Sequence, residues 1–139
     1  MPTGMDISAV GMNLEKLRLN ISSQNISMMN NASSVGQARK PVSLITNAIS
    51  THEFERLLSS GSGLDLEKSK LASLVQGNTK LVHEPKNPIA NQQGFVEYPD
   101  TDHLIEMMNV VRATRAYEAN VKAFNASKSM HEAALNIGK

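Results

Sequence analysis

The sequence predicts a mainly α-helical protein, in which long N- and C-terminal helices pair as a coiled-coil-like hairpin around a small β-containing middle region. Apolar residues recur at three- and four-residue steps near both ends of the chain. Four of the five prolines lie between residues 36 and 99, whereas no proline or glycine interrupts residues 101–137. We therefore divide the chain into an N-terminal helical segment (1–34), a middle region (35–100) and a C-terminal helical segment (101–139).

The first helix is predicted from Met5 to about Asn31. Asp6 or Ser8 can cap its start, and asparagine, serine and glycine between residues 30 and 36 mark its end. Polar Gln24 is the one interruption of an otherwise apolar heptad-like stripe. The stripe consists of Ile7, Val10, Leu14, Leu17, Ile21 and Met28.

The middle region changes character, because short segments of mixed pattern alternate there with glycine and proline. Residues 51–59 have a briefly helical pattern. Four segments are candidate strands, namely 42–46, 64–67, 80–83 and 94–98.

The second helix is predicted to follow an N-cap signal at Asp100–Asp102 and to run for about 35 residues, or roughly 50 Å. It carries two neighbouring stripes. The bulky stripe contains Met107, Val110, Thr114, Tyr117, Val121, Phe124, Lys128, His131 and Leu135. The small stripe contains Ala113, Ala116, Asn120, Ala123, Ser127 and Ala134. We expect the bulky stripe to pair with the first helix, and the surplus apolar face to contact neighbouring subunits, since one partner helix covers only one stripe.

Composition and motifs exclude several functional classes. The net charge of +1 gives no electrostatic signature of a nucleic-acid partner, and the absence of cysteine excludes disulfides and thiolate chemistry. No phosphate-binding loop, nucleophile motif or dinucleotide fingerprint occurs. We predict no catalytic residue, no cofactor and no small-molecule substrate.

Metal binding is not predicted either. The four histidines, at positions 52, 83, 103 and 131, fit no zinc-binding spacing. Asp100 and Asp102 lack the downstream ligands of a calcium loop, so helix capping explains them better.

The N-terminus has no basic segment followed by an apolar core, and charged residues interrupt every stretch long enough to span a membrane. We expect no direct membrane insertion and no cleavable signal peptide, so any export uses another route.

Three segments carry a resemblance to a known family. They are 5–26 (MDISAVGMNLEKLRLNISSQNI), 80–99 (KLVHEPKNP followed by GFVEYP) and 114–128 (TRAYEANV followed by AFNASK). The chain resembles the proximal rod subunits of the bacterial flagellar basal body. The resemblance implies a structural protein of the flagellum, exported by the flagellar type III apparatus. Such a subunit polymerises with its own copies and other rod proteins into the periplasm-crossing drive shaft that transmits motor torque for motility.

We assign the helix-packing and assembly interface to the apolar stripes and to the polar positions that the resemblance places in subunit contacts. These residues are Ile7, Val10, Leu14, Leu17, Ile21, Asn25, Met28, Met107, Val110, Val111, Arg115, Ala116, Tyr117, Asn120, Val121, Ala123 and Phe124. Because terminal helices without enough partners do not recover the entropy of ordering, we expect them to be partly unfolded in the isolated chain.

The alternative is a cytoplasmic helical adaptor or export chaperone that binds partner helices through the same stripes. Finding the chain in purified basal bodies, or only in cytosol, distinguishes the two functions.

Overall fold

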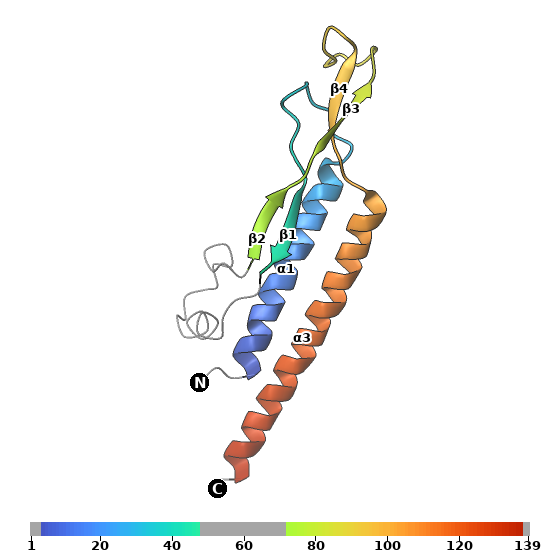
Figure 1. The fold of residues 1–139 in the computed structure, drawn as a ribbon. Coiled ribbons are helices and arrows are strands. Elements are labelled where there is room, and N and C mark those ends of the chain that lie inside the picture. The colour runs from blue at the N-terminus through green and yellow to red at the C-terminus, as the bar shows by residue number, and fades with distance from the viewer. Residues whose placement is uncertain (1–3, 48–71, 138–139) are drawn as a thin grey trace.

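A computed structural model describes residues 4–47 and 72–137 (Figure 1). The order of elements is α1 (Gly4–Met28), β1 (Val42–Thr46), β2 (Ala72–Gln76), β3 (Thr79–His83), β4 (Phe95–Pro99) and α3 (His103–Ile137). The two long helices pack side by side. The four strands all come between the two helices in the sequence. The predicted class, mainly α with a small β-containing middle region, is confirmed.

The helices run antiparallel. Gly4 lies against Ser127 and Gly11 against Asn120, so a step forward along α1 matches an equal step back along α3. At the other end of the pair, Asn25 hydrogen-bonds Glu106. Asp102 caps α3, since its Oδ1 accepts a hydrogen bond of 2.8 Å from the Leu104 N–H, which confirms the capping prediction.

The two helices differ in length, and α3 continues beyond the first residue of α1 (Figure 1). Residues 128–137 of α3, which we call the overhang, have no α1 residue opposite them. At about 1.5 Å per residue the overhang is about 15 Å long. Every one of its side chains is exposed, so the overhang gains nothing from packing within the pair.

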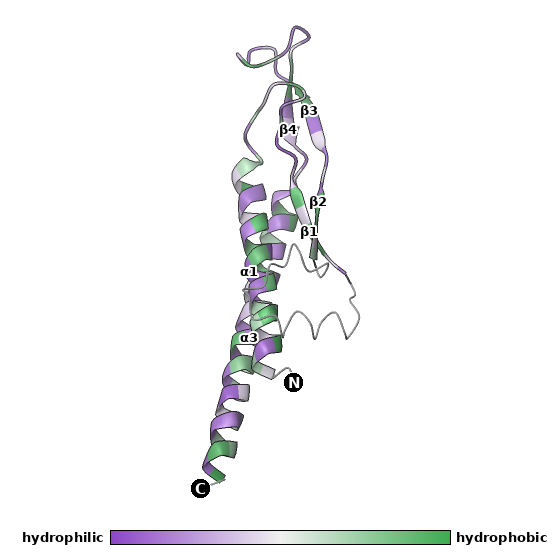
Figure 2. Ribbon diagram, turned by 90° about the vertical axis from the view of Figure 1, so that its left-hand side faces the viewer, coloured by the Kyte–Doolittle hydropathy of each residue, from purple (hydrophilic) through white to green (hydrophobic). Residues whose placement is uncertain are grey.

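The strands form two antiparallel two-stranded sheets, β1–β2 and β3–β4. Strand β1 packs on α1, whereas β3–β4 extends beyond the helices at the end opposite the chain termini (Figures 1 and 2). Two-stranded sheets are marginally stable alone. Their order therefore depends on attachments to α1 and to the connecting loops.

Glu97 of β4 attaches the loop that follows α1. Its backbone exchanges two hydrogen bonds of 2.9 Å with Ser33, and its carboxylate accepts hydrogen bonds from the Thr79 hydroxyl and from the Gly36 N–H. Gly36 has a φ of 86°, a left-handed conformation that favours glycine. These contacts fix the route of the chain from α1 to β1.

The predicted elements compare closely with the structure. The helices at both ends and the strands predicted at 42–46, 80–83 and 94–98 are present within three residues of the expected bounds. Strand β2 was not predicted. The strand expected at 64–67 and the short helix expected at 51–59 lie outside the described residues.

Candidate assembly interface

Small and polar residues lie where α1 and α3 approach most closely. A Cβ added to Gly4 would lie 2.8 Å from Ser127 Oγ, and one added to Gly11 would lie 2.7 Å from Asn120 Nδ2. Distances this short show that the helices approach as closely as glycine permits. Ser8, Glu15 and Ser22 are buried on the same side of α1. We call this contact the seam.

At one end of the seam, Asn25 joins three elements. Its side-chain amide donates hydrogen bonds of 2.8 Å to the Val42 carbonyl of β1 and to Glu106 Oε1 of α3. Its Oδ1 accepts a hydrogen bond of 3.0 Å from the Val42 N–H. Asn25 is only 2% exposed. Because a buried polar group costs free energy when unpaired, this network favours one register of the two helices over its neighbours.

Most bulky side chains of α3 lie outside the seam. Among the described residues of α3, only Glu106 and Ala113 are buried. Hydropathy colouring shows apolar residues along the whole length of both helices (Figure 2). The exposed large apolar side chains of α3 are Leu104, Ile105, Met107, Met108, Val111, Tyr117, Met130, Leu135 and Ile137. We call them the outer face of α3; the last three belong to the overhang.

This arrangement corrects one expectation in part. The bulky stripe of α3 was expected to hold the hairpin, but only Val110, Val121 and Phe124 are half-buried, whereas Met107, Tyr117 and Leu135 are exposed. The small stripe, with Ala113, Ala116 and Asn120, also faces α1. The physical reason is separation: glycine and serine on α1 bring the two backbones close, and only small side chains of α3 fit at those points. Part of the bulky stripe is thereby left outside.

The predicted interface residues fall into three groups by burial. Val10, Ile21 and Asn25 are buried. A second group is half-buried and comprises Leu14, Leu17, Met28, Val110, Ala116, Asn120, Val121 and Phe124. A third group is exposed and comprises Ile7, Met107, Val111, Arg115, Tyr117 and Ala123. The structure thus places some of them within the hairpin and leaves others facing outward; their role in assembly stays a prediction.

The sequence analysis missed the small residues of α1. Gly4, Ser8 and Gly11 follow three- and four-residue steps like those of the apolar stripe beside them, and Ser22 lies on the same side of the helix. A search for apolar periodicity passes over glycine and serine. The signal that could have revealed them is a heptad of small residues on each helix.

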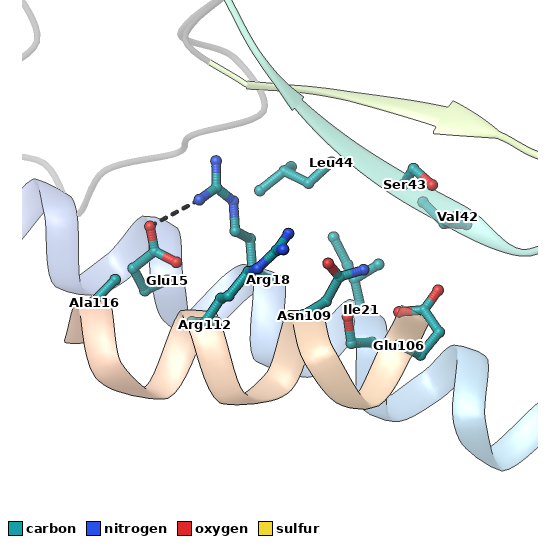
Figure 3. A pocket seen from close by; sticks show the side chains of 12 residues that line it. Glu15, Arg18, Ile21, Val42, Ser43, Leu44, Glu106, Asn109, Arg112 and Ala116 are labelled. Carbon is teal, nitrogen blue, oxygen red and sulfur yellow. Dashed lines mark hydrogen bonds and ion pairs between the residues drawn. The ribbon is translucent and has the colours of Figure 1, made fainter. Parts of the chain in front are cut away.

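A cleft of about 380 Å³ opens where α1, α3 and β1 meet (Figure 3). Glu15 and Arg18 of α1 form an ion pair of 3.0 Å on one wall, and Arg112 extends from α3 on the facing wall. Ile21 and Leu44 supply apolar surface. The cleft therefore combines charged groups with apolar walls.

Two groups near the strands have shifted pKa values. The hydrogen bond from the Thr79 hydroxyl, followed by that from the Gly36 N–H, lowers the pKa of Glu97 below its ordinary value. Partial removal from solvent raises the pKa of Tyr98, and the hydrogen bond that its hydroxyl donates to Glu84 raises it further. Both shifts belong to groups that hold loops in place.

Within residues 4–47 and 72–137 there is no group of three or more histidine, aspartate or glutamate side chains placed to bind a metal ion. In the same ranges, neither helix combines the length and the apolarity that a membrane span requires.

Comparison with known proteins decides the family. Residues 92–137, which cover β4 and α3, match the family model described as flagellar basal body rod FlgEFG protein, C-terminal. Over 97% of its length, the chain is 35% identical to the flagellar basal-body rod protein FlgC of Bacillus subtilis, of which it covers 96%. The chain belongs to the FlgC family of flagellar basal-body rod proteins.

Other members of the FlgC family match at similar coverage. The Escherichia coli O6:H1 protein is 30% identical over 96% of this chain and 95% of its own length. The Aquifex aeolicus protein is 27% identical over 97% of this chain and 95% of its own length. The family makes the chain a structural component of the flagellar basal-body rod and confirms the resemblance drawn from the sequence.

Proposed function

We propose that the chain self-assembles with its own copies and with other rod proteins into the drive shaft that crosses the periplasm and transmits motor torque. It reaches that site by the flagellar type III export route and performs no catalysis. One observation supports assembly above the others: the outer face of α3 remains exposed when the hairpin is complete.

The mechanism follows from that exposure. Burying a methionine, leucine or isoleucine side chain contributes about 1.5–3 kcal/mol. Met108 is 45% exposed and Leu135 is 62% exposed, so about half of this contribution is unused within one chain. Neighbouring helices in a tube would recover it. Many such contacts, repeated around the shaft, resist twisting.

We also expect the ends of the helices to become ordered only when the subunit joins the rod. The overhang packs against nothing in α1, and ordering each residue costs about 1–2 kcal/mol of backbone entropy. In the free subunit we expect the ends of both helices to open readily, and in the rod we expect them to be closed. A chain that unfolds at low cost is also suited to export through a narrow channel.

Hydrogen exchange tests this proposal. Purified subunit and isolated basal bodies are compared by mass spectrometry, with peptides from α1 and α3 followed separately. We expect fast exchange in the free subunit and strong protection in the rod. Equal protection in both samples would contradict the coupling, and finding the chain only in the cytosol would favour an adaptor or chaperone.

A further inference from the structure

The cleft between α1, α3 and β1 holds an unsatisfied acceptor. The Glu15 side chain is 9% exposed, and its Oε1 accepts the hydrogen bond from Arg18. Its Oε2 is buried and has no hydrogen-bond partner among the described residues. A buried carboxylate oxygen without a donor costs about 1–3 kcal/mol. A turn of the Glu15 side chain toward the cleft would present this oxygen to an incoming N–H group and remove that cost.

The facing wall of the cleft carries a hydrogen-bond donor. Arg112 lines the cleft from α3, is exposed, and makes no hydrogen bond or ion pair with the described residues. Glu15 and Glu106 balance Arg18 and Arg112 in formal charge, so the lining is neutral overall. A neutral group that both donates and accepts hydrogen bonds can pair with the Glu15 carboxylate on one wall and with the Arg112 guanidinium on the other. A carboxamide, the side chain of asparagine or glutamine, has this chemistry.

The chain carries such groups on a loop that projects away from the helices. Residues 84–94, which we call the tip loop, connect β3 to β4 at the far end of the hairpin (Figures 1 and 2). Gln92 and Gln93 are exposed there. Ile89, on the same loop, is 39% exposed and matches the apolar walls of the cleft.

The tip loop is ordered by its own hydrogen bonds. Asn91 Oδ1 accepts hydrogen bonds from the Gln93 N–H (3.0 Å) and the Phe95 N–H (2.9 Å). Asn87 donates from its side chain to Glu84 and accepts at Oδ1 from the Ile89 N–H. A loop that is already ordered loses little entropy when it binds. This order is not needed by the helix pair, which lies elsewhere in the molecule.

We propose that the cleft of one copy receives the tip loop of a second copy, with a Gln92 or Gln93 carboxamide donating to Glu15 Oε2 and accepting from Arg112. The tip loop lies at the opposite end of the strands from the cleft, so it belongs to a different copy from the cleft it fills. A loop-in-cleft contact uses two different surfaces, and such a contact builds a helical assembly when its rotation does not close into a ring. This inference rests on the proposed function, because the contact presupposes that copies of the chain assemble in the rod.

Cysteine cross-linking tests the contact, because the chain has no cysteine of its own. One variant carries Ser43→Cys at the cleft and Gln92→Cys on the tip loop. After mild oxidation of isolated basal bodies and of concentrated purified protein, we expect a ladder of disulfide-linked copies on a non-reducing gel. The matched control carries Ser43→Cys with Lys80→Cys, an exposed position on β3 outside the loop, and should give no ladder.

Side-chain variants sharpen the test. Gln92→Ala with Gln93→Ala removes the carboxamides, and the loss of two hydrogen bonds should weaken association of purified copies by about tenfold. Arg112→Gln should weaken it similarly, whereas Lys122→Gln, an exposed change on the same helix, should not.

No ladder in either preparation, equal ladders in both cysteine pairs, or a cross-link to a different protein would overturn the contact. So would unchanged association of the glutamine variant, the result expected if Arg112 turns to Glu15 within one chain. Presence of the unmodified chain in basal bodies is scored separately, so failure of this contact and failure of the rod assignment are distinguishable.

Discussion

The seam and the outer face of α3 belong to the same helix and have opposite characters. In the seam, small and polar residues meet at distances that only glycine allows, and the Asn25 network fixes the register. On the outer face, large apolar side chains are exposed, from 38% for Tyr117 to 87% for Ile137. We propose that the two surfaces have different roles: the seam holds one chain together, and the outer face joins chains to one another.

The largest effect is expected from breaking the seam at its polar end. Asn25→Ala leaves both polar groups of the Val42 backbone and the Glu106 carboxylate without their partner, and should lower the free energy of unfolding by about 3 kcal/mol. Urea unfolding followed by circular dichroism, in a stabilising osmolyte such as sucrose, measures this. Asn20→Ala, an exposed change on α1, is the control. A loss within about 0.5 kcal/mol for Asn25→Ala would contradict the role of the network.

Overpacking the seam comes next. Gly11→Leu forces a side chain into Asn120 and should cost about 2 kcal/mol, even though leucine favours helix more than glycine does. The same change in an Asn120→Ala background should cost less, because the obstructing amide is gone. Asn13→Leu, at an exposed position on α1, is the control, and a seam variant as stable as this control would show that the helices are not in close contact.

Changes on the outer face should separate stability from assembly. Met108→Asp or Leu135→Asp should leave the unfolding free energy of the subunit within about 0.5 kcal/mol, since both side chains are already exposed. Incorporation into basal bodies should fall at least about tenfold, or about 1.4 kcal/mol, because a charge would be buried between subunits. Immunoblots of purified basal bodies measure this, with Lys122→Ser as the control. Normal incorporation would remove the outer face from the interface.

The smallest effect concerns pH and the loop after α1. The pKa of Glu97 is lowered in the folded chain, so its contribution is present above the ordinary glutamate pKa and is lost as pH falls through the lowered value. Acidification should therefore release Gly36, seen as a shift of its amide signal in NMR spectra. Glu97→Gln should remove this titration, and Glu132→Gln should retain it. A Gly36 signal that does not respond to pH would contradict the attachment.

The sequence predicted the helices well and their contact poorly. Apolar periodicity and the Asp102 cap are local signals, and they placed α1 and α3 within a few residues. The seam depends on Gly4 and Gly11, which carry no hydrophobic signal. The hydrogen bond from Asn25 to Glu106 joins residues 81 positions apart, so nothing local to either residue indicates it.

The same limit explains the middle region. Strand β2 (Ala72–Gln76) pairs with β1 through residues about thirty positions away, so nothing local to β2 indicates its partner. The cleft also arises from three separate elements, so no local pattern in the sequence places Glu15 and Arg112 on the same cleft.

Accessibility of the outer face, free and assembled, tests the central claim most directly. Met108→Cys and Tyr117→Cys are each labelled with a maleimide in purified subunit and in isolated basal bodies. We predict rapid labelling of the free subunit and at least about tenfold slower labelling in the rod, because neighbouring helices would cover these positions. Equal labelling rates in the two samples would show that the outer face stays open in the rod, and would contradict the account.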